Sequence, residues 1–484
     1  MKKILCRADG NASVGLGHLY RIFALYEMYK ETFDVVLVTR EDSALQVFPE
    51  EYVVEVIPNK ITLEEEPDWL ANAFSSEEYS IIADGYQFVS EYQKKIKSLG
   101  FFLLYVDDLA REIMSADIVV NHALGYTPER YKTKNKTTFA LGTKYGILRP
   151  KFLEAAKGSR KIFRINSVFV CFGGADQYDL SLLAVQALLG FDQIKNIHIV
   201  LGGAYQHEEL FELKKAHSKI TLHQNIDEQK MVDLMQSCEF AIAPSSTVLY
   251  ELCCIKMPVL SGYFVENQKG IYTSFTEQDV VFSGGDFSGY TTEDFKTKIS
   301  EILAVSDHSE MMQKQAKLFD GKIKQRFLNL LLPVTFREAN LADTKLLFDW
   351  ANDEVVRSNS YNSEEIDFMS HKEWFESKLD DKNQLFFIAV QNNNDIGLIR
   401  YTIEEDHAVL GISIAQEHRG KDLAGHMLRE SARYYFKSHR LPIFAYIKKE
   451  NTASIHSFKK AGYTFLRNEE VKGCKSFVYQ LESI

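Results

Sequence analysis

The sequence lacks long hydrophobic runs and the paired cysteine spacings of metal sites. Its apolar runs, such as FLNLLLPV, are far too short to span a bilayer. The amino-terminal MKKILCRADG reaches Arg7 and Asp9 before a signal-peptide core can form, so we do not expect export. Of six cysteines only Cys253 and Cys254 are neighbours, and no C-x-x-C indicates zinc. We therefore expect reduced core thiols, no metal, no membrane contact and a cytoplasmic protein.

The chain also lacks an excess of basic residues. It has 56 Lys and Arg against 67 Asp and Glu, a formal net charge of -11, which disfavours a general nucleic-acid binder. An anionic small substrate remains compatible, because backbone amides and helix N-termini can hold phosphate. With 484 residues, 45% hydrophobic and 25% charged, the composition is typical of a soluble globular protein of two or three domains.

Short apolar runs alternate with longer amphipathic stretches through residues 1–150 and again through 151–330. This alternation predicts two successive α/β domains, each a parallel sheet covered by helices. The predicted strands of the first domain are KKILC, FDVVLVTR, YVVEVI, YSIIADG, FFLLYVDD and ADIVVNHA. Those of the second are SVFVCFGGAD, NIHIVLGGA, KITLHQN, EFAIAPSS and MPVLSGYF. A cleft between two such domains is a favoured ligand site.

The pattern of apolar and polar residues changes at PVTFREANLADTKLLFDWAND, after a charged helical stretch at 305–330. Three strands, QLFFIAVQ, DIGLIRYTIE and HAVLGISIA, precede a helix that starts near Gly420. We expect residues 334–484 to form a separate α+β domain built on an antiparallel meander.

The segment RADGNASVGLGHLYR follows the first predicted strand. Gly15 and Gly17 resemble a dinucleotide loop, but its third glycine would fall at Tyr20, and no P-loop lysine follows. The turn instead delivers His18 to the first turn of a helix, with Arg21 one turn later on the same face. A helix N-terminus favours the neutral imidazole, the form that accepts a proton. Either His18 is a base of this kind or it only caps the helix.

Polar residues follow several predicted strands at the edge where parallel sheets bind ligands. They are Asp9, Asp84, Asp107, Asp108 and Asn121. We expect Asp84, Asp107 and Asp108 to satisfy loop amides.

The second domain carries features of a nucleotide-diphosphate site. Gly173 and Gly174 follow a strand, where a plain turn or a pyrophosphate contact would both need glycine. In APSSTVLYELCC, Ser245 and Ser246 are expected to cap a helix whose amides bind phosphate. Glu251 lies two turns in and is expected to accept hydrogen bonds from ribose hydroxyls.

Together these segments, with GTKYGILRPKF and VENQ, resemble the UDP-sugar hydrolases of pseudaminic acid biosynthesis (PseG type) over residues 1–330. The resemblance implies the two-domain GT-B fold and metal-free, inverting removal of UDP from UDP-2,4-diacetamido-2,4,6-trideoxy-β-L-altropyranose. It implies that His18 activates water at C1 and that Tyr86 and Asn267 lie beside the sugar. The residues implied to hold the substrate or brace the loop are Arg7, Asp9, Gly17, Arg21, Gly173, Gly174, Ser245, Ser246 and Glu251.

The segment ISIAQEHRGKDLAGHMLRESARYYF resembles the acetyl-CoA-binding segment of GNAT N-acetyltransferases, R/Q-x-x-G-x-G/A, with Asp422 in place of the first motif glycine. In that family segment, free amides at a helix N-terminus bind the pyrophosphate. The Asp422 carboxylate is therefore expected to point away from the pyrophosphate. Downstream, KKENTASIHSFKKAGYTF resembles the family's N-x-x-S/A…GF segment. The residues implied to bind acetyl-CoA are Ile414, Arg419, Gly420, Lys421, Leu423, Ala424, Gly425, Asn451 and Ser454.

The GNAT resemblance leaves the acid and base of acetyl transfer open. The usual tyrosine seven residues after the asparagine is replaced by Phe458, so no general acid is named. A strand amide near Ser413 or Ile414 would polarise the thioester carbonyl. The candidates for a water-mediated base are Glu404, Glu405, His407 and His371.

These resemblances predict one chain for two consecutive steps. The hypothesis is acetylation of the C4 amine of a UDP-4-amino sugar by acetyl-CoA, a PseH-type reaction, followed by hydrolysis of the UDP-diacetamido sugar. Other enzymes of the same sugar pathway are expected partners. The alternative is a GT-B glycosyltransferase, or a hydrolase of a related UDP-sugar, joined to a non-catalytic GNAT-like module that binds CoA or serves for docking.

Overall fold

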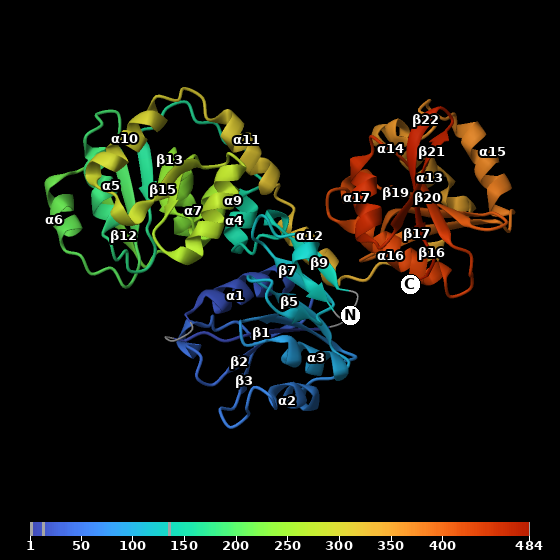
Figure 1. Cartoon of the computed structure of the whole chain (residues 1–484), viewed down its shortest axis with the longest axis horizontal. Helices are drawn as coiled ribbons and strands as arrows, with labels where there is room; N and C mark the ends of the chain where they lie inside the picture. Colours follow the sequence, from blue (N-terminus) through green and yellow to red (C-terminus); the bar gives the residue numbers. More distant parts are fainter. Residues whose placement is uncertain (1–2, 12–14, 134–136, 484) are drawn as a thin grey trace. The chain divides into compact units, whose positions relative to one another are not determined.

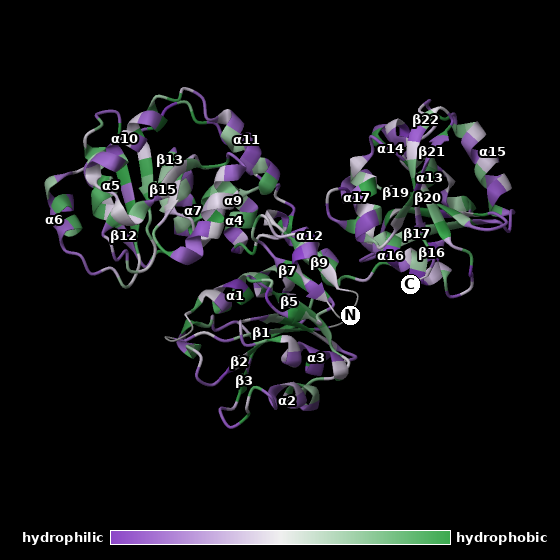
Figure 2. Cartoon of the chain, in the orientation of Figure 1, coloured by the Kyte–Doolittle hydropathy of each residue, from purple (hydrophilic) through white to green (hydrophobic). Residues whose placement is uncertain are grey.

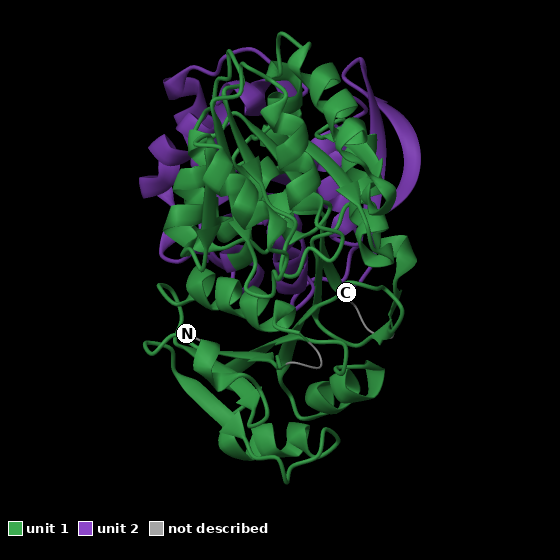
Figure 3. Ribbon diagram, turned by 90° about the vertical axis from the view of Figure 1, so that its left-hand side faces the viewer, with its two compact units in different colours: residues 1–327 green, residues 328–484 purple. Residues whose placement is uncertain are grey.

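The computed structural model describes residues 3–11, 15–133 and 137–483, and divides the chain into two compact units (Figure 3). Unit 1 spans 1–327 and unit 2 spans 328–484. The division falls close to the predicted start of the third domain at residue 334. Among the described residues, no helix has the length and apolar character needed to cross a membrane.

The first sheet of unit 1 has seven strands, and each pairs with its neighbour in parallel. Their order across the sheet is β3 (Val54–Ile57), β2 (Val35–Arg40), β1 (Lys3–Ala8), β4 (Tyr79–Asp84), β5 (Phe102–Val106), β7 (Ile118–Asn121) and β9 (Thr138–Leu141). The strand order reverses between β1 and β4, as in doubly wound nucleotide-binding sheets, which places a crevice beyond their carboxyl ends. A small pair, β6 (Ile113–Met114) with β8 (Lys132–Thr133), lies outside this sheet.

Helices cover both faces of this sheet. Helix α1 (Gly17–Tyr29) packs against β1 and β4, while α2 (Glu66–Ala73) and α3 (Ser90–Ser98) lie on the other side (Figure 1). The buried strand residues Leu5, Ile81 and Leu103 join Leu70 and Ile96 of these two helices in one cluster. Strands buried on both faces read as nearly continuous apolar runs, which is why they were predictable.

The second sheet of unit 1 repeats this arrangement with six parallel strands. Their order is β12 (Ile220–Gln224), β11 (Asn196–Leu201), β10 (Ser167–Val170), β13 (Phe240–Pro244), β14 (Val259–Tyr263) and β15 (Phe282–Asp286). The accompanying helices are α4 (Pro150–Ala155), α5 (Leu180–Leu189), α6 (Glu209–Ala216), α7 (Glu228–Ser237), α8 (Thr247–Cys254), α9 (Lys269–Glu277), α10 (Thr292–Leu303) and α11 (Ser309–Leu318). Helix α12 (Ile323–Leu331) follows, and its Phe327 contacts Tyr29 of α1 and Tyr145. The order reverses between β10 and β13.

Unit 2 is built on a seven-stranded, mostly antiparallel sheet. Its order is β16 (Thr335–Glu338), β17 (Gln384–Gln391), β18 (Asn394–Ile403), β19 (Ala408–Ile414), β20 (Ile443–Lys448), β22 (Cys474–Leu481) and β21 (Thr464–Val471). The predicted meander corresponds to β17, β18 and β19. Only β19 and β20 pair in parallel.

The helices of unit 2 lie on opposite faces of its sheet. They are α13 (Thr344–Ala351), α14 (Glu354–Asn359), α15 (Phe368–Leu379), α16 (Leu423–Tyr435) and α17 (Thr452–Lys460). Helices α16 and α17 share one core with Ile399 and Tyr401, whereas α13 and α15 share another with Phe386 and Ile388. Hydrophobic colour follows the strands and mixed colour the helices in Figure 2, as expected for helices with one buried stripe.

All the strands named from the sequence are present, and eight others were not named: β6, β8, β9, β15, β16, β20, β21 and β22. The five that lie before β17 have only two to five residues, and β15 contains Gly284 and Gly285, so none of these five carries a strong strand pattern. The other three, β20, β21 and β22, have six to eight residues and follow the predicted meander in the chain. The six cysteines are unpaired, and five of them are buried.

Candidate functional site

The loop after β1 brings His18 to the carboxyl ends of β1 and β4. Gly15 has φ +78°, a conformation that favours glycine, and α1 then begins at Gly17. Gly10 is also required, because a Cβ there would lie 2.7 Å from the Leu19 side chain. Residues 12–14 of this loop lie outside the described part of the chain.

His18 contacts the last residue of β4. Its Nδ1 lies 2.6 Å from Oδ1 of Asp84, which is completely buried. Because a carboxylate only accepts, Nδ1 carries the hydrogen and Nε2 of the neutral ring keeps its lone pair. This arrangement fixes the tautomer that a general base needs. The expectation that Asp84 satisfies loop amides is wrong; its partners are side chains.

Arg21 connects two carboxylates at the same edge. Its Nε and Nη2 donate to Asp84 at 2.8 and 2.6 Å, and its Nη1 donates to Asp108 at 2.6 Å. Nη2 also lies 2.9 Å from His18 Nδ1, one helical turn away, as predicted. Because Arg21 only donates, this is a close contact and not a second hydrogen bond when Nδ1 carries the hydrogen. Burial alone would raise the pKa of Asp108, but the Arg21 guanidinium outweighs it and holds that pKa below its usual range. Asp108 was therefore also wrongly expected to bind loop amides.

Tyr86 closes this cluster on the solvent side. Its hydroxyl donates to Asp108 Oδ2 at 3.2 Å, and its ring meets the His18 ring edge-on at a centroid distance of 4.7 Å. The Tyr86 residue is 58% exposed, so it can contact a ligand. We call His18, Arg21, Asp84, Tyr86 and Asp108 the His18 cluster. Asp107 lies beside it, and its Oδ2 accepts from the Ala110 amide and the Tyr131 hydroxyl.

Arg7 and Asp9 brace the loop from below. Arg7 is completely buried and donates to Glu66 through Nε at 2.7 Å and Nη2 at 2.9 Å. Its Nη2 also reaches Asp9 at 2.8 Å, and Asp9 accepts from the Arg40 amide at 2.8 Å. Of the two roles left open by the sequence, these contacts favour bracing over substrate contact.

His122 is a residue of this region that the sequence analysis missed. It follows Asn121, the last residue of β7, and its ring lies 5.0 Å from that of Tyr250 on α8. Burial, with help from the Arg21 charge, lowers the pKa of His122 to about 4. The only available signal was its position at a strand end, where Asn121 alone was noted.

In the second sheet, the predicted glycines and serines meet at the reversal between β10 and β13. Gly173 has φ +87°, and a Cβ on Gly202 would lie 2.3 Å from the Gly174 Cα, so the two loops approach closely. Ser246 is the N-cap residue of α8, but its side chain makes no capping hydrogen bond. The Ser245 hydroxyl bonds Ser261 at 2.9 Å instead, so the expected capping by both serines is wrong.

Glu251 is buried and already ion-paired. Arg149 contacts its Oε1 through Nε at 2.9 Å and Nη2 at 2.8 Å. Burial raises the pKa of Glu251, and Arg149 only partly opposes this rise. Asn267 lies exposed in the short helix Glu266–Gln268, and the described contacts do not connect it to the His18 cluster.

In unit 2, the candidate site is the place where the neighbouring strands β19 and β20 are no longer hydrogen-bonded to each other. β19 pairs with β20 only at Ala408–Ile443 and Val409–Phe444, while it pairs with β18 along its whole length through Ile414. The edge of β19 at Ser413 and Ile414 is therefore not bonded to β20. Such an edge offers backbone groups to an extended ligand.

The predicted acetyl-CoA loop joins Ile414 to the N-terminus of α16. Gly420 and Asp422 have φ of 74° and 59°, so Asp422 adopts the left-handed conformation that the motif glycine would supply. The Asp422 carboxylate is paired with Lys460. Arg419 donates to the Ile414 carbonyl at 2.9 Å and pairs with Asp353 at 2.8 Å. Lys421 precedes α16, and Leu423, Ala424 and Gly425 form its first turn.

The remaining predicted residues of unit 2 lie on helices and at the turn before β19. Asn451 caps α17 by accepting from the Ser454 amide at 3.0 Å, and Phe458 is buried against Tyr463. His407 lies at the amino end of β19 with Nδ1 2.6 Å from Asp406 and Nε2 3.5 Å from Glu404. His371 is buried on α15. Glu405 is exposed in the turn before β19.

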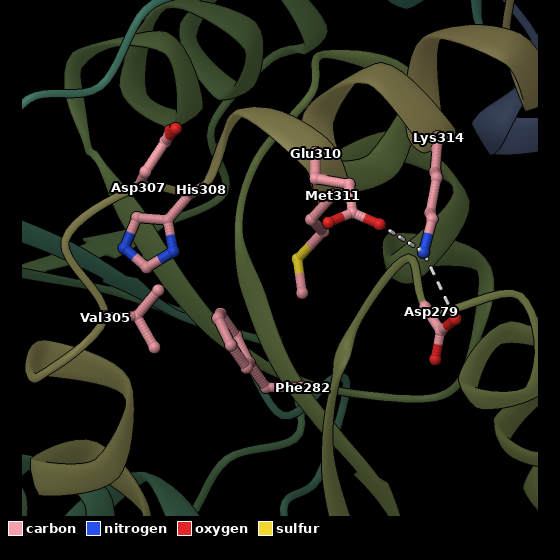
Figure 4. A pocket seen from close by; sticks show the side chains of 8 residues that line it. All are labelled: Asp279, Phe282, Val305, Asp307, His308, Glu310, Met311 and Lys314. Carbon is pink, nitrogen blue, oxygen red and sulfur yellow. Dashed lines mark hydrogen bonds and ion pairs between the residues drawn. The ribbon is translucent and has the colours of Figure 1, made fainter.

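A separate hollow of about 210 Å³ lies beside α11 and contains none of the predicted site residues (Figure 4). Its lysine, Lys314, is paired with Glu310 at 3.0 Å and Asp279 at 3.2 Å. No group of three His, Cys, Asp or Glu side chains in the described ranges is arranged to hold a metal ion.

Comparison with protein families defines the class of unit 2. Residues 334–464 match the Acetyltransferase (GNAT) domain family, so the carboxyl-terminal unit carries a GNAT domain. Over the whole chain, the uncharacterized protein MJ1062 of Methanocaldococcus jannaschii is 24% identical across 95% of this chain and 96% of its own. The spore coat polysaccharide biosynthesis protein SpsG of Bacillus subtilis is 27% identical across 65% of this chain and 93% of its own.

Solved structures similar to part of the chain include two acetyltransferases. The aminoglycoside acetyltransferase AAC(6')-Ib with coenzyme A is 17% identical over 31% of this chain and 94% of its own, with a TM-score of 0.29. Spermidine N-acetyltransferase of Vibrio cholerae with CoA and spermine is 21% identical over 30% and 92%, with a TM-score of 0.28.

Proposed function

We propose that the protein is a bifunctional enzyme of nucleotide-sugar metabolism. Unit 2 transfers an acetyl group from acetyl-CoA to the amine of a UDP-amino sugar, and unit 1 hydrolyses the acetylated UDP-sugar. The GNAT family match supports the first activity, and the relative named for polysaccharide biosynthesis supports a sugar substrate. The PseG- and PseH-type resemblances favour the UDP-4-amino and UDP-2,4-diacetamido sugars of pseudaminic acid synthesis. We propose that unit 1 is a GT-B pair of domains, because both sheets are parallel and the strand order of each reverses beside the strand that comes first in the chain, β1 or β10.

The hydrolase proposal depends above all on the contact between His18 and Asp84. His18 Nε2 takes a proton from water as the water oxygen bonds to C1 of the sugar. The bond from C1 to the phosphate oxygen breaks, and its electron pair leaves with UDP. This leaving group needs charge stabilisation more than protonation, so one base suffices. Asp84 stabilises the imidazolium that forms, and Arg21 holds Asp84 in place.

UDP is proposed to bind the second sheet, where Gly173, Gly174 and the N-terminus of α8 lie at the strand reversal. Unpaired amides at a helix start favour phosphate. Ser246 presents its side chain there, while Ser245 shapes the turn through Ser261. Glu251 is proposed to accept hydrogen bonds from ribose hydroxyls while it keeps its ion pair with Arg149.

In unit 2, acetyl-CoA is proposed to bind along the open edge of β19 and against the loop 419–425. The structure supports this fit because the Asp422 carboxylate is directed to Lys460. The free amine of the sugar attacks the thioester carbon, the carbon–sulfur bond breaks, and the thiolate departs as CoA after protonation. A backbone amide near Ser413 or Ile414, at this open edge, is proposed to polarise the carbonyl.

The proposal is tested by incubating the full chain with the UDP-4-amino sugar and acetyl-CoA. Free thiol should appear first and UDP second, and omission of acetyl-CoA should suppress both. Absence of UDP release from the diacetamido substrate would refute the hydrolase. Transfer of the sugar to an added acceptor would instead support a glycosyltransferase, and absence of acetyl-CoA binding by calorimetry would support a non-catalytic docking module.

A further inference from the structure

His122 is held in one tautomer by the backbone. The Ile147 amide donates to its Nδ1 at 3.3 Å, so Nδ1 is the acceptor. In a neutral imidazole the hydrogen must then be on Nε2. His122 is thus the opposite of His18, whose Nδ1 carries the hydrogen and whose Nε2 is the acceptor.

The surroundings of His122 keep the ring neutral. Packed against it are Tyr250 and the backbone at Ile147, while the charged groups that act on it are Arg21, Asp108 and Asp84. Arg21 opposes a second positive charge, and its pairing with both carboxylates limits their opposite effect. A neutral ring near physiological pH donates from Nε2 without giving up the proton.

The Nε2–H group makes no hydrogen bond with the described part of the chain. It is also not one of the described polar atoms that are both without a partner and shielded from solvent. The donor is therefore available to a ligand. Tyr250, the residue against which the ring packs, lies in the first turn of α8. The available donor thus lies near the helix start at which we place the diphosphate.

We propose that His122 is a second functional histidine of unit 1, a fixed N–H donor to the departing diphosphate of a nucleotide-sugar substrate. This inference rests on the proposed hydrolase function. The donor acts on the phosphate oxygen that gains the electron pair when the bond to C1 breaks. No proton is transferred from His122: the water proton goes to His18, and UDP leaves as an anion. A preformed donor of this kind strengthens as charge develops.

The test compares His122→Phe, which keeps a ring against Tyr250 but removes the donor, with His122→Gln, which restores an N–H near the Nε2 position. We expect kcat for UDP release to fall about 10²-fold in His122→Phe with KM nearly unchanged, and His122→Gln to recover at least about tenfold. His198→Phe, on β11, is the matched control and should stay within about twofold of the unmodified protein. Thermal unfolding midpoints establish that each variant is folded.

A second measurement does not depend on activity. Imidazole nitrogen shifts of the full chain, assigned with the His122→Gln variant, should show an Nε2–H tautomer that does not titrate between pH 5.5 and about 8. An Nδ1–H tautomer, or folded His122→Phe with unchanged kcat, would overturn the inference. Absence of UDP release by the unmodified protein would instead refute the proposed hydrolase function, so the two failures are distinguishable.

Discussion

The candidate sites of the two units are built from different groups: mainly side chains in unit 1 and mainly backbone groups in unit 2. In unit 1, charged side chains gather at the carboxyl ends of strands that are hydrogen-bonded to neighbours on both sides. In unit 2, the ladder itself opens after Val409 and Phe444, and the candidate binding groups are backbone amides and a loop. Strands that are paired on both sides cannot offer their own hydrogen-bonding groups to a ligand, so the proposed base of unit 1 is a side chain, whereas the interrupted sheet of unit 2 can use strand backbone.

This comparison predicts that unit 1 is sensitive to side-chain chemistry and unit 2 to backbone conformation. The largest expected effect is that of His18→Ala. Loss of the base should reduce UDP release by at least about 10³-fold, because a positioned base contributes up to about 10⁴-fold. UDP affinity, measured by calorimetry, should be nearly unchanged.

Acetyl transfer by the same variant provides the internal control and should be unaffected. UDP release at the unmodified rate would show that the His18 cluster is not the site of hydrolysis. Loss of both activities together would break the distinction between the two units.

A smaller effect is expected from Asp422→Val in unit 2. Valine tolerates the left-handed conformation poorly, at a cost of about 1–2 kcal/mol, so the acetyl-CoA KM should rise about 5–30-fold. Asp422→Gly keeps the conformation while removing the carboxylate that pairs with Lys460, and should stay within about twofold. Equal loss in both variants would mean that the ion pair, and not the backbone, matters.

The last effect concerns Asp9 and is one on stability at low pH, not on catalysis. Burial alone would raise the Asp9 pKa, but Arg7 and the Arg40 amide lower it overall. A lowered folded-state pKa stabilises the protein above the unfolded value of about 3.9, and this contribution is lost as pH falls through the folded value. Asp9→Asn should therefore cost about 1.5–3 kcal/mol of unfolding free energy at pH 6, measured with urea.

The difference between Asp9→Asn and the unmodified protein should shrink below pH about 3.9. Asp34→Asn, at an exposed position, is the control and should show little difference at either pH. A difference that is constant with pH would contradict the ionic origin of the effect.

Much of the fold followed from local patterns. Buried parallel strands are apolar throughout, so β1, β4 and β13 were predictable, whereas β15 was not, because its middle is Ser-Gly-Gly. The candidate site was predictable in part. The spacing of His18 and Arg21 already places them one turn apart, and Asp84 is recognisable at a strand end, but the sequence contains no local signal that Asp84 is their shared partner.

The sequence alone determined the periodicities, the His18–Arg21 spacing, the likeness to GNAT segments and the absence of a third loop glycine. These are properties of neighbours along the chain. Only the tertiary structure decided that Arg21 bridges Asp84 and Asp108, that Lys460 neutralises Asp422, and that the Ile147 amide sets the tautomer of His122. Such contacts join residues far apart in sequence, and strand order, which brings them together, has no counterpart in local composition.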